Sequence, residues 1–532
     1  MTIGANPGTN ATPIPNLIST SYRRGHHLER ETMAMNYYTP TTLPTPLSWY
    51  LFLSPLIALV VYIVGNEYVR ASAKIPGLKG PRGWPLVGSL LDVRDNAAMK
   101  YQEWAKKYGD VYQVQLGNTN VVVVNSAAAA KALFQTNSQA LSSRPVTYTF
   151  HKGAGSSASF TIGTSPYDES LKRKKKGAAV ALNRPAIQSY IPYLDLETKS
   201  FLKDLLDFGK VGTKPIDPLP MIQRMSLSLV TTINWGVRVR SIEDELFKEI
   251  VTVEEELNRT RSTIGNPADH IPLLRLSPFS QVSATSRLLR QRRDKYMVKF
   301  DSDVASILKY KEAELTDAEL RSISLSMTSG GFETVANSVH WTIGHLALHP
   351  DIQDRAHEEI RQFTGPGMPD AADDQKCAYI LALAKEALRY FTVIPLALPR
   401  VSIKEVHHDE VLIPTGSTVY MNAWACNRDP EVWSDPGIFR PERWLEKPDA
   451  TLFTFGLGYR MCSAHLLAIR ELYLIFMRLL SSFRLEAGGE VRCDPRVDLK
   501  NSKDLIMGAK PYRVLCVPRD TKSLTEYLMA NE

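Results

Sequence analysis

Cys462 is the residue of this sequence best suited to bind a metal ion. It ends a glycine-bearing segment, Phe455-Gly-Leu-Gly-Tyr-Arg-Met-Cys462, and a largely apolar helical run from 466 to 480 follows it. The two glycines let the backbone turn tightly enough for its amides to face the sulfur. The start of a helix and the nearby Arg460 favour the thiolate, which is the form that binds metals. A lone thiolate in such a turn suits the axial ligand of a haem iron, and the alternative is a buried structural cysteine.

The same segment resembles the haem-binding loop of cytochrome P-450 monooxygenases, whose pattern is Phe-x-x-Gly-x-Arg-x-Cys-x-Gly. Phe455, Gly458, Arg460 and Cys462 match it, while Ala464 stands where the family usually has glycine. Three further motifs match in the family's order and spacing, so the resemblance covers residues 74 to 518. It implies haem b as the cofactor, with Cys462 as the axial ligand of the iron and the other three matching residues in the loop that binds the haem.

A second motif lies in a long predicted helix that begins at the capping box Thr316-Asp-Ala-Glu319 and ends at His349-Pro350. Inside it, Ser329-Gly-Gly-Phe-Glu-Thr334 holds two adjacent glycines, which cost about 1 kcal/mol each relative to alanine. Either a flat, bulky group or a tightly crossing helix would explain them. In the family this helix crosses the distal haem face. The resemblance therefore implies that Glu333 and Thr334 deliver protons to dioxygen, with Thr334 bonding back to its own helical turn.

The basic run Leu171-Lys-Arg-Lys-Lys-Lys176 opens a helix that reaches Leu182. On composition alone it predicts a solvated basic face. The family has Trp-x-x-x-Arg here, which binds a haem propionate, and Leu171 and Lys175 take those two positions. We therefore expect Lys175 to bind the propionate as a point charge, without the fork of arginine. The remaining basic residues would suit an acidic, electron-donating partner.

Two arginines outside the cysteine loop also have roles by resemblance. Arg400 ends the apolar segment Val393-Ile-Pro-Leu-Ala-Leu-Pro-Arg400 and is expected to pair with a propionate; an unrelated surface arginine is the alternative. Glu386-x-x-Arg389 places two charges on one helical face, and burial of such a pair requires further partners. The family supplies the arginine of a Pro-Glu-Arg segment, which matches Pro441-Glu-Arg443. Glu386, Arg389 and Arg443 are thus expected to form a structural triad.

Residues 144 to 165 are rich in serine, threonine, glycine and aromatic side chains and lack periodicity, so they predict a loop. An ordinary surface loop is one interpretation. In the family this loop covers the haem and lines the substrate pocket. Together with the matching distal segments, the resemblance implies pocket residues Tyr148, Phe150, His151, Gly330, Ile394 and Ile506, with Lys152 and Phe160 as further candidates. Arg144, His151 and Lys152 are hypothesised to hold a substrate carboxylate.

The N-terminal region predicts a membrane anchor. Residues 47–64 form an uncharged run of about 18 residues, which is long enough to span a bilayer. Arginine and lysine follow this run and are absent from residues 31 to 46, so the bulk of the chain is expected in the cytosol. A cleaved signal peptide is the alternative. Residues 1–46 are expected to be a disordered tail, with Met1, Met33 or Met35 as the initiator, and residues 65–90 a proline- and glycine-rich hinge.

Composition bounds the rest of the prediction. With 532 residues, 44% of them hydrophobic, the chain can bury a large core, and the resemblance implies one mainly α domain with a small β lobe over residues 91–532. The net charge of +7 suits an anionic membrane or an acidic protein, and no basic–aromatic pattern indicates nucleic acid. The five cysteines lack a C-x-x-C pair, so neither a disulfide framework nor a zinc site is predicted.

The resemblance implies a monooxygenase of the endoplasmic reticulum membrane that uses O2 and electrons from NADPH–cytochrome P-450 reductase or cytochrome b5. Strings such as Trp104-Ala-Lys-Lys-Tyr-Gly-Asp-Val111 and Thr161-Ile-Gly-Thr-Ser-Pro-Tyr167 resemble fungal phenylacetate and hydroxyphenylacetate hydroxylases. The implied substrate is a small aromatic acid or a phenolic secondary metabolite. Two alternatives stay open: a haem-thiolate isomerase or dehydratase that needs no reductase, and a non-catalytic haem-binding protein.

Overall fold

The computed structural model describes residues 46–154, 161–262, 264–276, 281–301 and 314–529. The predicted tail up to residue 45, with Met33 and Met35, lies outside these residues, as do Phe160 and the side chain of Lys152. The chain divides into two units, residues 1–59 and 60–532. Helix α1 (Pro46–Ser72) contains Pro55 and begins in the first unit and ends in the second. Among the described residues, Leu53–Ser72 is the helical stretch long and apolar enough to cross a membrane.

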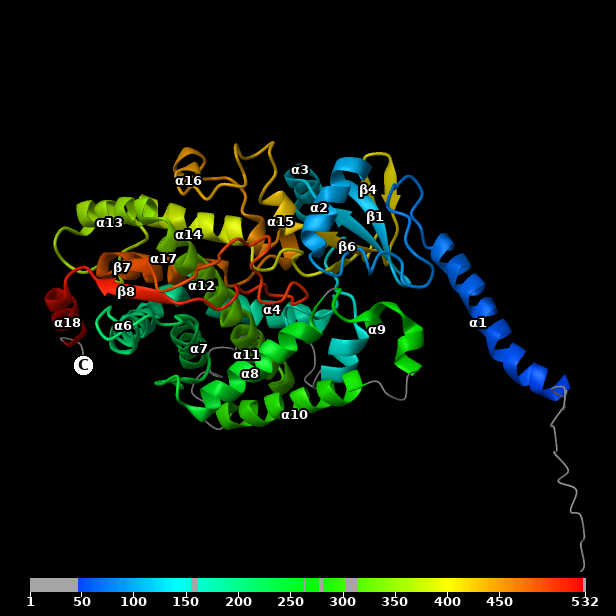
Figure 1. Cartoon of the computed structure of the whole chain (residues 1–532), viewed down its shortest axis with the longest axis horizontal. Coiled ribbons are helices and arrows are strands. Elements are labelled where there is room, and N and C mark those ends of the chain that lie inside the picture. Colours follow the sequence, from blue (N-terminus) through cyan, green and yellow to red (C-terminus); the bar gives the residue numbers. More distant parts are fainter. Residues whose placement is uncertain (1–45, 155–160, 263, 277–280, 302–313, 530–532) are drawn as a thin grey trace, which may run out of the picture. The chain divides into compact units, whose positions relative to one another are not determined.

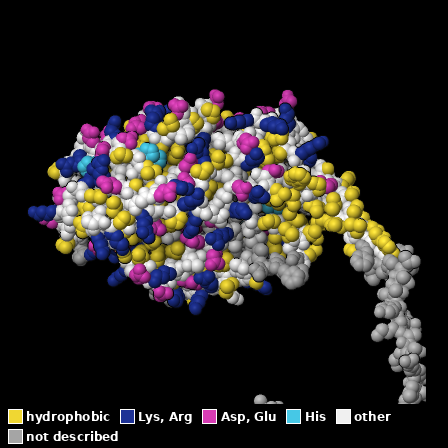
Figure 2. Space-filling view, in the orientation of Figure 1, with side chains coloured by type: hydrophobic (Ala, Val, Ile, Leu, Met, Phe, Trp, Pro, Cys, Tyr) yellow, Lys and Arg dark blue, Asp and Glu magenta, His cyan; other side chains and the backbone are white. Residues whose placement is uncertain are grey.

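The second unit is mainly helical, as predicted, with three small sheets (Figure 1). Its helices are α2 (Ala97–Tyr108), α3 (Ala127–Ala130), α4 (Glu169–Ala181), α5 (Arg184–Ser189), α6 (Ile191–Phe208), α7 (Leu219–Trp235), α8 (Glu245–Thr260), α9 (Pro267–His270), α10 (Gln281–Asp301), α11 (Asp317–Gly331), α12 (Glu333–Leu348), α13 (Pro350–Thr364), α14 (Ala378–Phe391), α15 (Ala423–Cys426), α16 (Arg443–Glu446), α17 (His465–Ser482) and α18 (Thr521–Met529). On the face shown in Figure 2, Lys and Arg are interspersed with Asp and Glu.

The predicted β lobe is confirmed as a four-stranded sheet of β1 (Val111–Leu116), β2 (Thr119–Val124), β6 (Thr418–Met421) and β3 (Arg400–Val401), in that order. β1 and β2 form a hairpin around Gly117 and Asn118, and β2 pairs in parallel with β6, which lies almost 300 residues later. β4 (Val406–His408) pairs with β5 (Val411–Ile413), and β7 (Phe483–Ala487) with β8 (Val514–Pro518). Arg400 is the first residue of β3, so the sheet fixes the position of its backbone.

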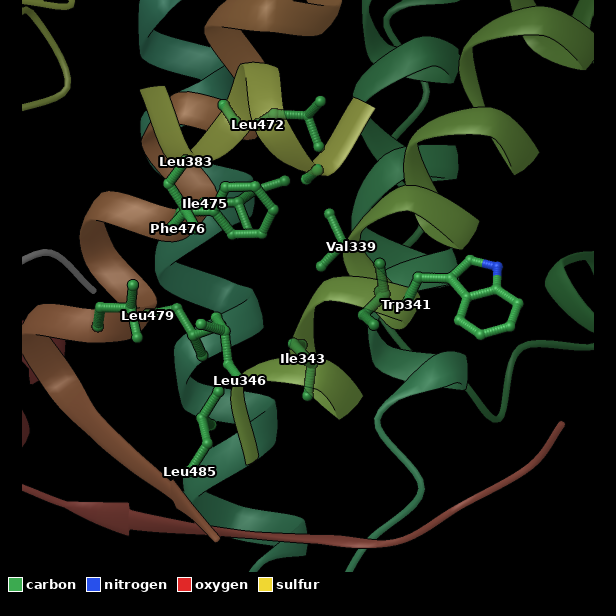
Figure 3. Close-up of a cluster of buried hydrophobic side chains, with 14 of the residues drawn as sticks. Val339, Trp341, Ile343, Leu346, Leu383, Leu472, Ile475, Phe476, Leu479 and Leu485 are labelled. Atoms are coloured by element: carbon green, nitrogen blue, oxygen red, sulfur yellow. The ribbon is translucent and has the colours of Figure 1, made fainter. Parts of the chain in front are cut away.

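The largest core cluster joins α12, α14 and α17 (Figure 3). Leu472, Ile475, Phe476 and Leu479 of α17 recur at helical spacing and are buried, so one face of that helix is apolar. They pack with Val339 and neighbouring side chains of α12 and with Leu383 of α14. Full burial of each such side chain stabilises the fold by roughly 1.5–3 kcal/mol. This packing fixes α17, whose first turn follows Cys462, relative to α12, which continues the glycine-bearing helix.

The helix predicted from 316 to 349 is two helices, α11 and α12, which meet at Phe332. The capping box that starts α11 is confirmed, since Thr316 and Glu319 bond each other's backbone amides. The break was not predicted. Phe332 itself keeps right-handed helical angles (φ −79°, ψ −70°), and the Thr334 hydroxyl donates to the Gly330 carbonyl at 2.7 Å. The Thr334 side chain thus occupies a carbonyl that a backbone amide would accept in a continuous helix, in the turn between α11 and α12.

Glu386 of α14 is fully buried and lies at the centre of an ion cluster. Its carboxylate accepts two hydrogen bonds of 2.8 Å from Arg389 and one of 3.1 Å from Arg443. The Trp444 indole and the Arg440 backbone amide also donate to it. The three residues proposed as a triad therefore lie together, with two additional donors that the sequence did not indicate. Burial of a carboxylate is tolerated when it is paired and its lone pairs are filled, as they are here.

We expect Glu386→Gln to destabilise the protein by about 3–5 kcal/mol, because it leaves two buried guanidiniums without their anion. The measurement is the denaturant midpoint of the full chain. Glu446→Gln is the matched control, because Glu446 pairs with Arg440 at the half-exposed surface and such pairs contribute about 0–1 kcal/mol. Equal midpoints for the two variants would contradict a bracing role for Glu386.

Candidate functional site

The loop that carries Cys462 consists of two short 3₁₀ turns, Phe453–Phe455 and Gly458–Arg460. The Cys462 amide donates to the Phe455 carbonyl at 2.8 Å, which closes the loop on itself. Gly458 has a φ of +59°, and a β-carbon there would lie 2.1 Å from the Phe134 carbonyl oxygen. Only glycine satisfies both the left-handed backbone and this close approach. The glycine of the motif is therefore required by packing against Phe134, a contact that the sequence alone does not indicate.

The surroundings of the Cys462 thiol differ in one respect from the sequence-based expectation. Its exposed surface faces a cavity, which it lines. Burial raises the pKa of Cys462, and the Ala464 amide and the Lys175 ammonium oppose this rise. Arg460, which was expected to favour the thiolate, donates instead to the carbonyls of Ser142 and Ser165. Arg460 is not among the groups that lower the pKa of Cys462, which are the Ala464 amide and the Lys175 ammonium.

The cavity encloses about 310 Å³ and is lined by residues from the cysteine loop, α4, α11, α12 and α17. Four cationic side chains lie on its wall: Arg144, Lys175, Arg400 and Arg460. Each donates to backbone carbonyls, for example Arg144 to Gly163 at 2.9 Å and Arg400 to Leu457 at 2.7 Å. None of the four forms an ion pair with a carboxylate of the described residues.

Burial and mutual repulsion act on all four cations. Burial lowers the pKa of Arg400 to about 9 and that of Arg460 to about 10. Burial and the neighbouring guanidiniums lower the pKa of Lys175 to about 8 and that of Arg144 well below its usual value. A buried cluster of like charges destabilises the folded protein unless an anion binds beside it. A ligand with a flat apolar body and two carboxylates, as in haem b, fits a cavity that has these cations and a cysteine sulfur on its wall.

Lys175 lies where the family has arginine, and the structure shows what holds it there. Its ammonium lies 4.4 Å from the centre of the Tyr459 ring and donates to the Tyr459 carbonyl. Leu171 lies at the position of the usual tryptophan and is fully buried. Its side chain has no polar atom that could bind a ligand. A cation–π contact with the cysteine loop thus positions the lysine.

The distal wall of the cavity is formed by Gly330, Gly331, Thr334 and Ser338, with Met327 and Val335 beside them. Glu333 is not on this wall. Its carboxyl is buried on the side of α8, where burial and the neighbouring Glu254 raise its pKa to about 8. The two residues predicted to act together are therefore adjacent in sequence, but only Thr334 borders the cavity.

Of the six predicted pocket residues, Gly330 and Ile394 line the cavity. Tyr148, Phe150, His151 and Ile506 do not. The first three belong to a π-helical turn, Tyr148–Ala154, where a loop was predicted. Phe150 packs 5.1 Å from the Arg261 guanidinium, and the His151 ring accepts from the Thr147 amide at 2.9 Å. Ile506 is buried and its backbone pairs with the Asn258 side chain.

Arg144, expected to hold a substrate carboxylate, instead joins the cationic cluster, because its donors reach the carbonyls of Gly163 and Pro399. Sequence reasoning missed several cavity residues, among them Phe134, Ile162, Leu398, Leu467 and Glu471. Ile162 and Leu398 lie in strings that the sequence analysis quoted without assigning these two residues to the pocket, whereas Phe134 and Glu471 lie in none of the motifs. They can be identified as cavity residues only from the tertiary structure, which brings their separate segments together.

Comparison with known proteins agrees with this geometry. The sequence profile described as Cytochrome P450 matches residues 78–516. A 3-hydroxyphenylacetate 6-hydroxylase of Emericella nidulans is 53% identical over 486 residues, which cover 88% of this chain and 94% of that protein. A phenylacetate 2-hydroxylase of the same organism is 38% identical, with 89% and 96% covered. A cytochrome P-450 monooxygenase of Mycosarcoma maydis is 37% identical, with 89% and 94% covered.

The match spans nearly the whole helical unit, whose cavity is lined by Cys462, by the four cations and by the glycines of α11. The chain belongs to the cytochrome P-450 family and is a haem b-dependent monooxygenase of that family.

Proposed function

We propose that the chain hydroxylates a small phenylacetate-like acid or a phenolic intermediate of secondary metabolism. The observation that supports this most directly is 53% identity to a hydroxylase of a phenolic arylacetate, across almost its entire length. The net reaction consumes the substrate C–H bond, O2, NADPH and a proton. It yields the hydroxylated product, water and NADP⁺, so one oxygen atom enters the substrate and the other is reduced.

Haem b, when bound, supplies the binding of dioxygen and the cleavage of its O–O bond. Cys462 would supply the thiolate that binds the haem iron, with Phe455 and Gly458 shaping the loop around it. Arg400, Arg460 and Lys175 would hold the propionates, and Arg144 completes this group. The two propionate charges would then offset the mutual repulsion of the four cations.

Thr334 and Glu333 would bind and supply the protons that the reaction consumes. Because the Thr334 hydroxyl donates its hydrogen to Gly330, its oxygen is left to accept a bond, which would hold a water molecule at the cavity wall. Glu333, with a pKa of about 8, keeps its proton at neutral pH and would serve as the acid that supplies it.

Electrons would come from NADPH–cytochrome P-450 reductase, with cytochrome b5 as a second donor. The exposed lysines of α4, Lys172 and Lys176, offer positive charge to an acidic partner beside the cysteine loop. We propose a single-pass anchor in the endoplasmic reticulum through residues 47–64. Residues 65–90 would be a hinge and 91–532 the catalytic domain in the cytosol.

The proposed function is tested by turnover. Membranes that hold the full chain and the reductase should convert phenylacetate or 3-hydroxyphenylacetate into a hydroxylated product, and only when NADPH and O2 are present. Cys462→Ser should abolish this product. Conversion of these acids without NADPH or O2 would support the isomerase or dehydratase alternative. A thiolate-type carbon monoxide spectrum without turnover of these acids would reject the substrate class while retaining the haem site.

The role of Glu333 predicts a pH dependence. The carboxyl faces Glu254, Glu255, Asp504 and Arg261, and its raised pKa means that it is protonated below about pH 8 and loses its proton above. We expect product formed per NADPH consumed to fall as pH rises through 8. Glu333→Gln should lower this ratio at every pH and remove its pH dependence, whereas the exposed control Glu245→Gln should behave as wild type. A Glu333→Gln profile that still falls near pH 8 would contradict the assignment.

The anchor is tested by deleting residues 1–64. We expect the shortened chain to keep its carbon monoxide spectrum, because the contact of Asn66 with Asn118 and the remaining fold stay intact. It should leave alkali-washed membranes, which the full chain should not. Retention of the shortened chain on such membranes would show that other residues bind the membrane.

A further inference from the structure

Glu471 of α17 is an acidic residue that borders the cavity and has no role in the site described so far. It is 3% exposed, and among the described residues that line the cavity it is the only aspartate or glutamate. The Ser226 hydroxyl of α7 donates to its Oε1 at 3.2 Å. Within the described part of the chain, Oε2 forms no hydrogen bond and the carboxyl forms no ion pair. A buried acid without a counter-charge requires an explanation.

The part of the cavity wall that surrounds Glu471 is apolar. The same faces of α17 and α7 contribute five apolar side chains to this wall: Leu467, Ala468, Leu472, Val230 and Ile233. The four cations of the wall belong to other segments, and neither they nor Cys462 shift the pKa of Glu471. The carboxyl therefore lies apart from the groups that would hold the propionates, at an apolar part of the cofactor cavity.

Burial determines the charge of Glu471. It raises the pKa of the carboxyl to about 8, and the hydrogen bond from Ser226 opposes this rise. Because the group is an acid with a raised pKa, it is neutral below about pH 8 and becomes a carboxylate above it. The wall therefore gains a negative charge at this position when the pH rises.

The titratable groups on the neighbouring elements do not provide a counter-charge. Arg224 of α7 pairs with Glu197 of α6 at 2.9 Å. Arg470, which precedes Glu471 in α17, donates to a backbone carbonyl at 2.7 Å. Burial lowers the pKa of His340 in α12 to about 3, so that this ring is neutral at physiological pH. The charge of a Glu471 carboxylate would thus act on whatever occupies the cavity.

A carboxylate at this wall would oppose reduction of the haem. Reduction adds one electron to the cavity, and a buried negative charge repels that electron, since Coulomb interactions are weakly screened inside a protein. A neutral carboxyl exerts no such repulsion. The same hydrogen bond to Ser226 can exist in both states, because Oε1 accepts it whether or not Oε2 carries a proton.

We propose that Glu471 controls the reduction potential of the haem: its neutral carboxyl lets the haem accept an electron, and its ionisation lowers the potential. Above about pH 8, reduction is then coupled to proton uptake. Ferric haem, one electron from the redox partner, one proton from solvent and the Glu471 carboxylate give ferrous haem and the Glu471 carboxylic acid. This inference concerns electron acceptance, so it does not depend on which acid is the substrate.

The test is a spectroelectrochemical titration of the haem-loaded full chain between about pH 6 and about pH 9. At a fixed applied potential, we expect the ferrous-to-ferric ratio of wild type to fall about tenfold as the pH rises through about 8, which is about 59 mV for a one-electron couple. Glu471→Gln keeps an acceptor for Ser226 but cannot ionise, so its ratio should not fall in this range. The control Glu245→Gln, at a 90% exposed side chain, should behave as wild type.

Two further variants separate this role from other causes. Ser226→Ala removes the bond that lowers the pKa of Glu471, so the fall should move to higher pH. A bond that only joins α7 to α17 would leave the pH of the fall unchanged. Glu333→Gln removes the other buried carboxyl with a pKa of about 8 and should retain the fall, because Glu333 is not on the cavity wall.

Every result supports or overturns control by Glu471. A wild-type ratio that does not change with pH, a fall that persists in Glu471→Gln, or a fall that disappears in Glu333→Gln would overturn it. If Glu471→Gln does not retain haem, Ser226→Ala decides, since a fall at an unchanged pH would contradict the assignment. These measurements need no substrate, so failure of the proposed acid substrate would leave their result intact.

Discussion

The buried carboxylate of Glu386 is the interaction on which the site depends most. Arg389 both binds Glu386 and donates to the Asn427 carbonyl at 3.0 Å. The Asn427 side chain in turn accepts from the Phe453 amide and donates to the Thr454 hydroxyl. An uninterrupted line of hydrogen bonds therefore runs from the ion cluster to the first turn of the cysteine loop. Each buried polar group in this line requires its hydrogen-bond partners to stay in place. The position of Cys462 therefore depends on an ion cluster that is centred on a different helix.

The same constraint, that buried charges need partners, distinguishes the two sides of the cavity. On the loop side, four cations converge and none of them pairs with a carboxylate of the described residues, so the fold leaves room for two negative charges. Beside α8, away from the cavity wall, Glu333 avoids a charge by keeping its proton. The cofactor would bring the negative charge that the protein lacks on the loop side. Binding of the cofactor would thus offset the repulsion that remains among the buried cations of the folded protein.

Much of this architecture was predictable where a local rule was strong. The capping box at Thr316, the hairpin around Gly117 and the cysteine loop rest on residue types that satisfy nearby backbone groups. The break at Phe332 was not predictable in this way, because a helix with two glycines can remain continuous or bend according to what packs on it. The carbonyls that Arg460 and Arg144 bind were not predictable for a related reason. A long side chain can reach several partners, and the sequence does not say which one is near.

The sequence by itself determined the family, the cofactor and the identity of the residue that would bind its iron, since these depend on residue types at short spacing within one loop. Only the tertiary structure decided which charges meet. It brought Arg144, Lys175, Arg400 and Arg460 together from four distant segments, turned Glu333 away from the cavity and set Arg261 beside Ser329. Such encounters depend on how helices α4, α8, α11 and α17 pack, which is set by the buried faces of the whole core rather than by any local pattern.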